Sequence, residues 1–182
     1  RYVAGGRPGA VIVGSHVRKT TAQLERLLQL PTVEAVEVDV ERIDRDHAAL
    51  LDETLSRVTT AHGQGRHPVV FTSRREKTFP DQAARLAFGE RVSAFLMEVV
   101  RHLPTTLGFL VSKGGITSND VLASGLSLTM SRVLGQILPG CSVVRCPPDH
   151  PRHPDMPVVI FPGNVGDDDG LARVVQRLGP VV

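Results

Sequence analysis

Three short segments of this 182-residue sequence combine glycines with small hydroxyl or acidic side chains. They are Gly14-Ser15-His16, the segment KGGITSND from Lys113 to Asp120, and the segment FPGNVGDDDG from Phe161 to Gly170. Glycine allows a backbone to approach a ligand closely, and several backbone N–H groups at a helix start can hold an anion together. The three segments therefore predict a site for a phosphorylated ligand.

The central segment, 113–120, places two glycines beside hydroxyl residues at a predicted helix start, with Thr117 or Ser118 as the expected N-cap. It is not a Walker A motif, because Lys113 precedes the glycines and no Gly-Lys-Ser/Thr ends the segment. Asp120 would lie in the first helical turn, where the helix dipole alone favours a carboxylate. A structural role and a role as a ligand of Mg²⁺ or water are therefore both open for Asp120.

In the third segment, Gly163 and Gly166 bracket Asn164, and three aspartates, 167–169, stand at the start of the last predicted helix. Compensation of the helix dipole accounts for the aspartates, but it leaves the glycine-rich stretch before them unexplained. Carboxylates beside a triphosphate would repel it, so a divalent cation is expected with such a ligand.

Other chemically interesting residues give weaker signals. His150 and His153 lie three residues apart in a proline-rich loop without the further ligands that complete a metal site. The segment 73–75 (Ser-Arg-Arg) follows a predicted strand, and it could line the same strand-end pocket or form a solvated, salt-bridged turn. Cys141 and Cys146 belong to no metal or redox motif, so they are expected to be ordinary intracellular thiols.

The elements that must position these residues are predicted from apolar runs and helical periodicity. Strands are expected at 10–14, 33–40, 68–72, 106–111, 128–138, 142–146 and 158–161, and helices at 20–30, 43–60, 81–102, 121–125 and 168–178. The short helix 121–125 should end at a glycine in the left-handed conformation. The alternation predicts an α/β fold: a three-layer, Rossmann-like, largely parallel sheet flanked by helices, with a mixed or antiparallel part around 127–146. Ligands of such sheets bind beyond the carboxyl ends of the strands, where the three segments lie.

Composition excludes several classes of protein. Hydrophobic residues make up 41% and charged residues 22%, which argues against a disordered chain. The net charge of +2 comes from scattered residues, and no apolar run approaches the about 20 residues of a membrane span. The first residues do not show the basic-then-apolar pattern of a secretory signal segment. We therefore expect a cytoplasmic protein with no nucleic-acid or membrane partner.

The succession of KGGITSND, RVLGQILPG (132–140) and FPGNVGDDD resembles the C-terminal nucleotide-binding domain of the four-carbon acid sugar kinases, a family long known as a domain of unknown function. GSHVRKTTAQL (14–24) resembles the start of the same domain, and the resemblance spans about residues 10–180. It implies an ATP-dependent kinase that phosphorylates a hydroxyl of threonate, erythronate or 3-oxo-tetronate.

The resemblance carries over to particular positions. The implied nucleotide contacts are Ser15, Gly114, Gly115, Ile116, Thr117 and Gly163, with Asn164 and Gly166 beside them. We add Ser118 to this set, with Lys113 and Asp120 as candidate catalytic residues and Asp120 as the candidate Mg²⁺ ligand. His16, Arg18-Lys19 and Asn119 depart from the usual family pattern, which leaves the substrate subgroup open.

In the family an N-terminal domain holds the acid sugar, so we expect the general base there. Residues 1–9 are expected to be a linker or tail, and residues 10–182 the nucleotide-binding domain of a longer kinase, in agreement with the first residue, Arg1, not being Met. This part alone should bind ATP with Mg²⁺ and have little or no kinase activity. The expected partners are the missing domain and a small acid sugar, and the chain could form a homodimer.

Two other functions stay open. A dinucleotide-binding oxidoreductase domain would carry Asp39 near the end of its second strand, but GSHVRK (14–19) lacks the glycines of that motif. A non-catalytic nucleotide-sensing or interaction module is the second alternative.

Overall fold

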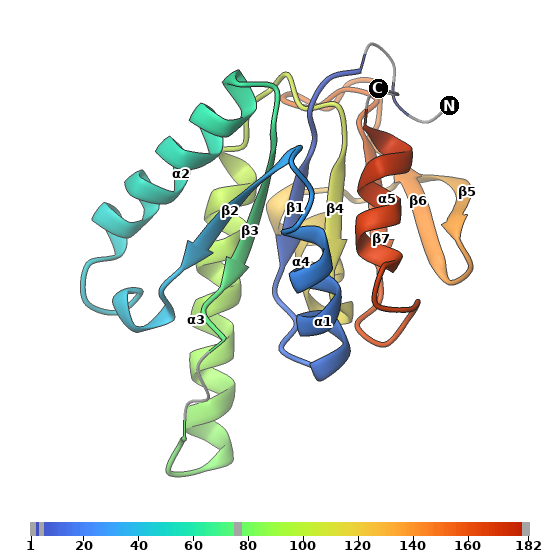
Figure 1. Cartoon of the computed structure of the whole chain (residues 1–182). Coiled ribbons are helices and arrows are strands. Elements are labelled where there is room, and N and C mark those ends of the chain that lie inside the picture. The colour runs from blue at the N-terminus through green and yellow to red at the C-terminus, as the bar shows by residue number, and fades with distance from the viewer. Residues whose placement is uncertain (1–2, 4–5, 75–77, 180–182) are drawn as a thin grey trace.

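Seven strands form a single sheet in the order β2-β3-β1-β4-β7-β6-β5. The structure is a computed structural model that describes residues 3, 6–74 and 78–179 (Figure 1). The strands are β1 (Ala10–Val13), β2 (Val33–Val38), β3 (His67–Thr72), β4 (Leu110–Lys113), β5 (Arg132–Leu138), β6 (Cys141–Arg145) and β7 (Pro157–Phe161). The helices are α1 (Arg18–Leu27), α2 (His47–Gly63), α3 (Gln82–Arg101), α4 (Gly115–Asp120) and α5 (Gly170–Leu178). A 3-10 helix covers Val40–Arg42 and a π-helical turn covers Val121–Gly125.

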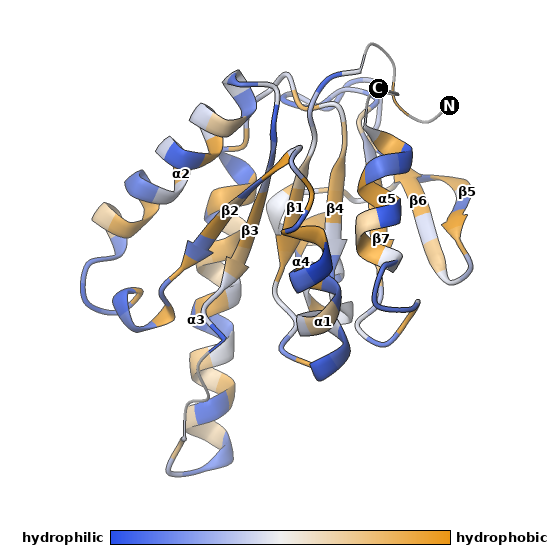
Figure 2. Cartoon of the chain, viewed as in Figure 1, coloured by the Kyte–Doolittle hydropathy of each residue, from blue (hydrophilic) through white to orange (hydrophobic). Residues whose placement is uncertain are grey.

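The central strands β1, β3 and β4 are buried on both faces. Successive side chains of a strand point to opposite faces of the sheet, so each strand contributes to two cores. In β1, Ala10 and Ile12 join the core under α2 and α3, whereas Val11 and Val13 join the core under α1 and α5. All four are fully buried, and burying a valine or isoleucine side chain stabilises a fold by about 1.5–3 kcal/mol. Apolar residues accordingly run through the strands and the inner sides of the helices (Figure 2). The predicted three-layer α/β fold is confirmed.

The last two strands in the sheet order, β6 and β5, join the sheet through antiparallel pairings. β6 pairs antiparallel with β7 and with β5, whereas β2, β3, β1, β4 and β7 are mutually parallel. This hairpin is the antiparallel part predicted around 127–146. The strand expected from residue 128 begins only at Arg132.

The parallel register aligns the strand ends that precede the three glycine-containing segments. Val13 of β1 is paired with Lys113 of β4, and Lys113 is paired with Phe161 of β7. The ladder continues one residue further, since Gly14 N–H donates to the Lys113 carbonyl at 3.4 Å and Gly114 N–H donates to the Phe161 carbonyl at 2.9 Å. The residues that follow the three strands therefore leave the sheet side by side at one edge, the lower one in Figure 1.

The described part of the segment 1–9, expected to be a linker or tail, packs against the domain. Val3 is buried in the core under α1 and α5. The Gly9 N–H donates to Nδ1 of His67 at 3.0 Å, and the Pro8 carbonyl accepts from the Gly108 N–H at 2.9 Å.

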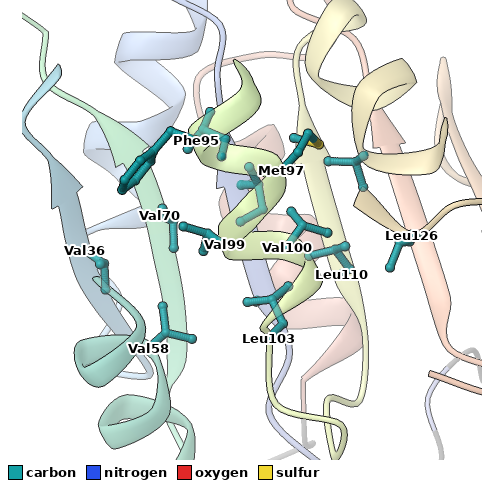
Figure 3. Close-up of a cluster of buried hydrophobic side chains, with 14 of the residues drawn as sticks. Val36, Val58, Val70, Phe95, Met97, Val99, Val100, Leu103, Leu110 and Leu126 are labelled. Atoms are coloured by element: carbon teal, nitrogen blue, oxygen red, sulfur yellow. The ribbon is translucent and has the colours of Figure 1, made fainter. Parts of the chain in front are cut away.

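The helical segment after β4 differs from the prediction. The helix expected at 121–125 begins earlier, as α4, and continues into the π-helical turn. Gly125 does not take the left-handed conformation, which Ser127 adopts instead with φ of 53°. A Cβ on Gly125 would lie 2.7 Å from Cγ1 of Val100 and 3.2 Å from Sδ of Met97, so glycine lets this turn approach α3 (Figure 3).

Within the described residues, no helix combines the length and the apolar character that a membrane crossing needs.

We expect Gly125→Ala to destabilise the protein by about 1–3 kcal/mol, because the added methyl group enters the packed contact with α3. Urea denaturation followed by circular dichroism measures this change. Gly89→Ala is the matched control, since Gly89 is exposed within α3 and a Cβ there would meet nothing within 4 Å. The control should be more stable than the original protein by up to about 1 kcal/mol. Equal stability of the Gly125→Ala variant and the original protein would contradict the packing argument.

Candidate functional site

The three predicted segments meet around Ser15. A Cβ built on Gly114 would lie 3.0 Å from Cβ of Ser15, and one built on Gly163 would lie 3.4 Å from the Ser15 hydroxyl oxygen. A Cβ on Gly14 would lie only 2.3 Å from the Thr117 hydroxyl oxygen. Glycine at 14 and 114 thus permits the close approach of the first and central segments, so the sheet brings together residues about 50 and 100 positions apart.

Thr20, near the start of α1, ties two of these segments together. The single O–H of this fully buried side chain donates to the Ser15 hydroxyl oxygen at 3.1 Å, and its oxygen also lies 3.3 Å from the carbonyl oxygen of Gly163. The Val17 N–H approaches the Ser15 hydroxyl oxygen at 3.4 Å. Ser15 is therefore held in place from its own loop and from α1.

The carbonyl oxygens of the segment 162–167 are held by side chains from β4 and α1. Lys113 Nζ donates to the carbonyl oxygens of Pro162 at 2.7 Å and Gly163 at 3.1 Å. Gln23 Nε2 donates to those of Val165 at 2.9 Å and Asp167 at 2.7 Å. Lys19 Nζ donates to the Gly166 carbonyl oxygen at 3.1 Å. Nothing in the sequence pattern marked Gln23, which is fully buried, as part of the site. Its position on the same helix as Lys19 and Thr20, four or fewer residues away, is the signal that could have found it.

This arrangement sets the direction of the backbone N–H groups. In a planar trans peptide the C=O and the following N–H point in opposite directions. Because the carbonyls of Pro162, Gly163 and Val165 point toward the side chains that hold them, the amides of Gly163, Asn164 and Gly166 point away from those side chains. These are the three residues of this segment that the sequence predicts as nucleotide contacts.

The central segment presents a second group of amides. Gly114 has φ of 122°, a conformation that favours glycine, and it is the residue immediately before α4. The Ser118 N–H donates to the Gly114 carbonyl at 2.9 Å, so the amides of Gly115, Ile116 and Thr117 precede the first hydrogen bond of the helix. A Cβ on Gly115 would meet nothing within 4 Å. The Ile116 side chain is 80% exposed.

Thr117 and Ser118 are not the N-cap, and that prediction is wrong because the N-cap is Gly114, three or four residues earlier than expected. The buried Ser118 hydroxyl accepts from the Ser112 hydroxyl at 2.9 Å and lies 3.2 Å from the Ser112 carbonyl. Its hydrogen bonds therefore lie inside the protein. Thr117, which is also buried, stays in the cluster through its contact with Gly14 and Gly114.

Asp120 lies apart from this cluster. It is five residues after Gly115, about 7.5 Å along a helix, and its carboxylate accepts a hydrogen bond from the Ser93 hydroxyl of α3. Among the described residues, no three His, Cys, Asp or Glu side chains gather as a metal site would require. The structure thus adds no second carboxylate to Asp120, and its assignment to Mg²⁺ stays a prediction.

Lys113 lies behind the backbone of the segment 162–167. It is the last residue of β4, which extends two residues beyond the strand predicted at 106–111, and its side chain is fully buried. Nζ lies 4.2 Å from the centroid of the Phe161 ring, and burial lowers the pKa of this ammonium group to about 8. The two carbonyl hydrogen bonds and the ring contact make Lys113 a residue that positions the segment 162–167.

Arg74 joins the site from β3, the strand next to β1 on the side opposite β4. Its Nη1 donates to the Ser15 carbonyl at 2.5 Å. His16 Nε2 lies 2.9 Å from the Thr72 hydroxyl oxygen, and burial, followed by the positive charge of Arg74, lowers the pKa of His16. Of the two interpretations of the segment 73–75, the structure supports the strand-end pocket for Arg74, whereas Arg75 lies outside the described residues.

A cavity of about 640 Å³ lies elsewhere, beside the β5–β6 hairpin. Its lining includes Met130, Arg132, Leu134 and Arg145 and none of the predicted site residues. It is therefore separate from the convergent loops.

A family model described as a nucleotide-binding C-terminal domain matches residues 10–171. The chain belongs to this family. The match confirms the resemblance to the C-terminal nucleotide-binding domain of the four-carbon acid sugar kinases that the three segments predicted. No curated protein sequence matches the chain.

Solved structures share the fold of this nucleotide-binding domain. A Bordetella bronchiseptica protein with a domain of unknown function, crystallised with citrate as a domain-swapped dimer, has a TM-score of 0.73 and 19% identity over 94% of this chain and 41% of its own. A second crystal form of it gives a TM-score of 0.65 and 22% identity over 96% of this chain and 40% of its own. A Salmonella typhimurium LT2 protein described as a candidate tRNA synthase has a TM-score of 0.69 and 21% identity over 98% of this chain and 42% of its own. The chain thus spans about two fifths of the length of these structures.

Among the described residues, no third His, Cys, Asp or Glu side chain gathers with the histidine pair of the proline-rich loop. The His150 and His153 rings stack with centroids 5.8 Å apart, and His150 Nδ1 accepts from the backbone N–H of His153 at 2.9 Å. His153 is buried and neither of its ring nitrogens has a hydrogen-bond partner in the described part of the chain. Burial, helped by the nearby His150 and Arg152, lowers the pKa of His153 to about 4.

We expect the protein to lose stability as the pH falls from 6.5 toward 4, because the unfolded state binds a proton to His153 that the folded state rejects. The folded-state pKa lies below the unfolded one, so this contribution is present above the unfolded pKa and lost below it. His153→Gln should remove about 1.5 kcal/mol of the loss between pH 6.5 and 5. Urea unfolding at both pH values measures the difference. The exposed His102, changed to Gln, is the control, and equal acid sensitivity of the His153→Gln variant and the original protein would contradict the assignment.

Proposed function

We propose that this domain binds ATP at the carboxyl edge of its sheet, within a kinase that transfers the γ-phosphate to a hydroxyl of a four-carbon acid sugar such as threonate, erythronate or 3-oxo-tetronate. The observation that carries the proposal is the convergence of three glycine-containing loops on Ser15. Two groups of backbone amides lie there: one precedes the first hydrogen bond of α4, and the other points away from the side chains that hold the segment 162–167. Family membership supports the nucleotide, and the resemblance of the three segments supports the kinase.

Backbone donors suit phosphoryl transfer because that reaction needs positioning and charge stabilisation more than covalent chemistry. The amides of 115–117 and of Gly163, Asn164 and Gly166 would hold the phosphate oxygens, and the Ser15 hydroxyl would add a donor between them. Since these amides are fixed by α4 and by the side chains that hold the segment 162–167, they need little reorganisation when charge develops.

Mg²⁺ would supply charge neutralisation between the phosphates when bound. One half-buried carboxylate, Asp120, that already accepts from Ser93 does not by itself make a protein cage for the ion. Mg²⁺ commonly keeps several waters and is held largely by substrate phosphates, so we propose that it enters with the nucleotide.

The dinucleotide alternative has less support. Asp39, which would hold a ribose in such a domain, instead accepts a hydrogen bond from the Glu41 N–H at 3.0 Å and caps the 3-10 helix. The first loop also lacks the glycines that bring a pyrophosphate close to a helix start.

We expect the domain to bind ATP and ADP with Mg²⁺ and not NAD⁺, as measured by isothermal titration calorimetry. Gly115→Ala should weaken ATP binding about tenfold or more, since the methyl group would occupy the open space that a phosphate must enter. The fold should tolerate the change, because alanine in a helix is favoured over glycine.

Gly89→Ala is the control for this experiment, as it makes the same substitution at an open helical position away from the strand ends. It should leave nucleotide binding unchanged. Absence of nucleotide binding by the original domain, or equal affinity in the Gly115→Ala variant, would overturn the proposed site.

The kinase reaction needs a second substrate site and a general base, which we place in the part of a longer chain that corresponds to the remaining length of the solved structures. We expect the present chain alone to release no ADP from ATP in response to threonate or erythronate, and a longer chain carrying the acid-sugar domain to do so. A coupled ADP-release assay measures both. Turnover by residues 1–182 alone would place the base in this domain, and ATP binding without turnover in the longer chain would favour a nucleotide-sensing module.

A homodimer and a cytoplasmic location complete the proposal. The Bordetella bronchiseptica protein is described as a domain-swapped dimer, which supports self-association for the longer chain. An ATP-dependent reaction on a small metabolite agrees with the cytoplasm.

A further inference from the structure

Arg74 carries a guanidinium group with unused donors beside Ser15. Nη1 donates to the Ser15 carbonyl, whereas Nε and Nη2 are buried and have no hydrogen-bond partner among the described residues. Unpaired buried donors are costly, and more so on a charged group, which indicates that an acceptor is missing.

Other arginines of this protein show the contrast. The Arg42 guanidinium donates to the carboxylates of both Asp46 and Glu53, and Arg173 donates to Asp167 at 2.6 Å. Among the described residues, Glu37 is the carboxylate whose charge affects Arg74, and its attraction is outweighed by burial, which lowers the pKa of the guanidinium. The residues that the structure describes therefore leave the Arg74 charge largely uncompensated.

The surroundings place this charge at the nucleotide site. β3 and β4 flank β1, so Arg74 lies on one side of Ser15 and the amides of Gly114 and the following residues lie on the other. Its field reaches the loop after β1, since the Arg74 charge contributes to the lowered pKa of His16. An oxyanion that entered between these elements would meet backbone donors from β4 and β7 and a guanidinium from β3.

We infer that Arg74 is an anion-binding residue of this site, whose Nε and Nη2 together receive one oxyanion. The inference rests on the proposed nucleotide site. The planar fork of an arginine matches two oxygens of a phosphate or of a carboxylate. The anion is either a phosphoryl group of the nucleotide or the carboxylate of the acid substrate.

The test compares Arg74→Gln and Arg74→Lys with the original chain by calorimetry, using ATP with Mg²⁺ and ADP with Mg²⁺. Threonate, in the presence of a non-hydrolysable ATP analogue, is titrated into the same variants of a longer chain that carries the acid-sugar domain. Arg74→Gln should weaken binding of at least one of these ligands about tenfold or more. Arg74→Lys should retain only part of the original affinity, because an ammonium group keeps the charge without the planar fork of donors. Arg101→Gln is the matched control. Arg101 also donates one hydrogen bond to a backbone carbonyl, that of Ser124, but it is the last residue of α3 and lies away from Ser15.

The pattern of losses distinguishes the sources of the anion. Weaker ATP binding with unchanged ADP binding assigns Arg74 to the terminal phosphate, weaker binding of both assigns it to an inner phosphate, and weaker threonate binding alone assigns it to the carboxylate. The ligand-free Arg74→Gln chain should unfold at the same temperature as the original or higher, because the substitution removes unpaired buried donors.

The pKa of His16 and nucleotide binding by the original chain keep the test of the inference separate from the test of the proposed function. The pKa of His16, followed by NMR, should rise in Arg74→Gln and not in Arg101→Gln, which confirms that the side chain lies where the structure has it. If the original chain binds no nucleotide, the proposed function fails. If the original chain binds nucleotide and both Arg74 variants bind all three ligands equally well, or if Arg74→Gln only lowers the unfolding temperature, the inference is overturned.

Discussion

The buried ammonium of Lys113 is the interaction on which the geometry of the site depends. It ends β4, and it reaches across to the residues after β7, where it donates to two consecutive carbonyls and lies over the Phe161 ring. Removing an ammonium from water is expensive, and here two carbonyl dipoles and a ring face replace the lost hydration. Because β4 also leads directly into Gly114 and α4, this one side chain holds the central and third loops in a fixed relation. Thr20 and Gln23 of α1 complete the arrangement from the other direction.

A site built in this way relies on backbone rather than on a basic surface, in agreement with the net charge of +2. Nearby arginines pair with two of the three aspartates at the end of the third segment. Asp167 is paired with Arg173, which lowers the pKa of its carboxyl, and Asp169 lies 3.8 Å from Arg26. These exposed pairs add little to stability, but they partly offset negative charge next to the proposed phosphate site.

Much of the fold was predictable because its signals are local. The β-branched runs predicted the buried strands, helical periodicity predicted the long helices, and the strand-rich texture around 127–146 predicted the antiparallel hairpin. Helix boundaries were less predictable. The hydroxyls of Thr117 and Ser118 are typical of an N-cap, yet α4 begins at Gly115, since Gly114 reaches a φ that the hydroxyl residues would adopt only with strain. Gly125 was expected to end a helix in the left-handed conformation, but its role is the close contact with Val100.

The sequence by itself determined the chemistry of the site: the residue types, their order along the chain, and the glycines that let backbones approach one another and a ligand. Only the tertiary structure decided which of those residues face the same space. Strand pairing of Val13 with Lys113 and of Lys113 with Phe161 brought Ser15, Gly114 and Gly163 together. In the folded chain the Ser118 hydroxyl bonds to Ser112 and the Asp120 carboxylate to Ser93. Gln23 and Arg74 join the site only through the tertiary structure. The physical reason is that these residues meet only when strands about 50 and 100 residues apart become neighbours in the sheet. The apolar pattern of one strand fixes which of its faces are buried, but it does not name the strand beside it.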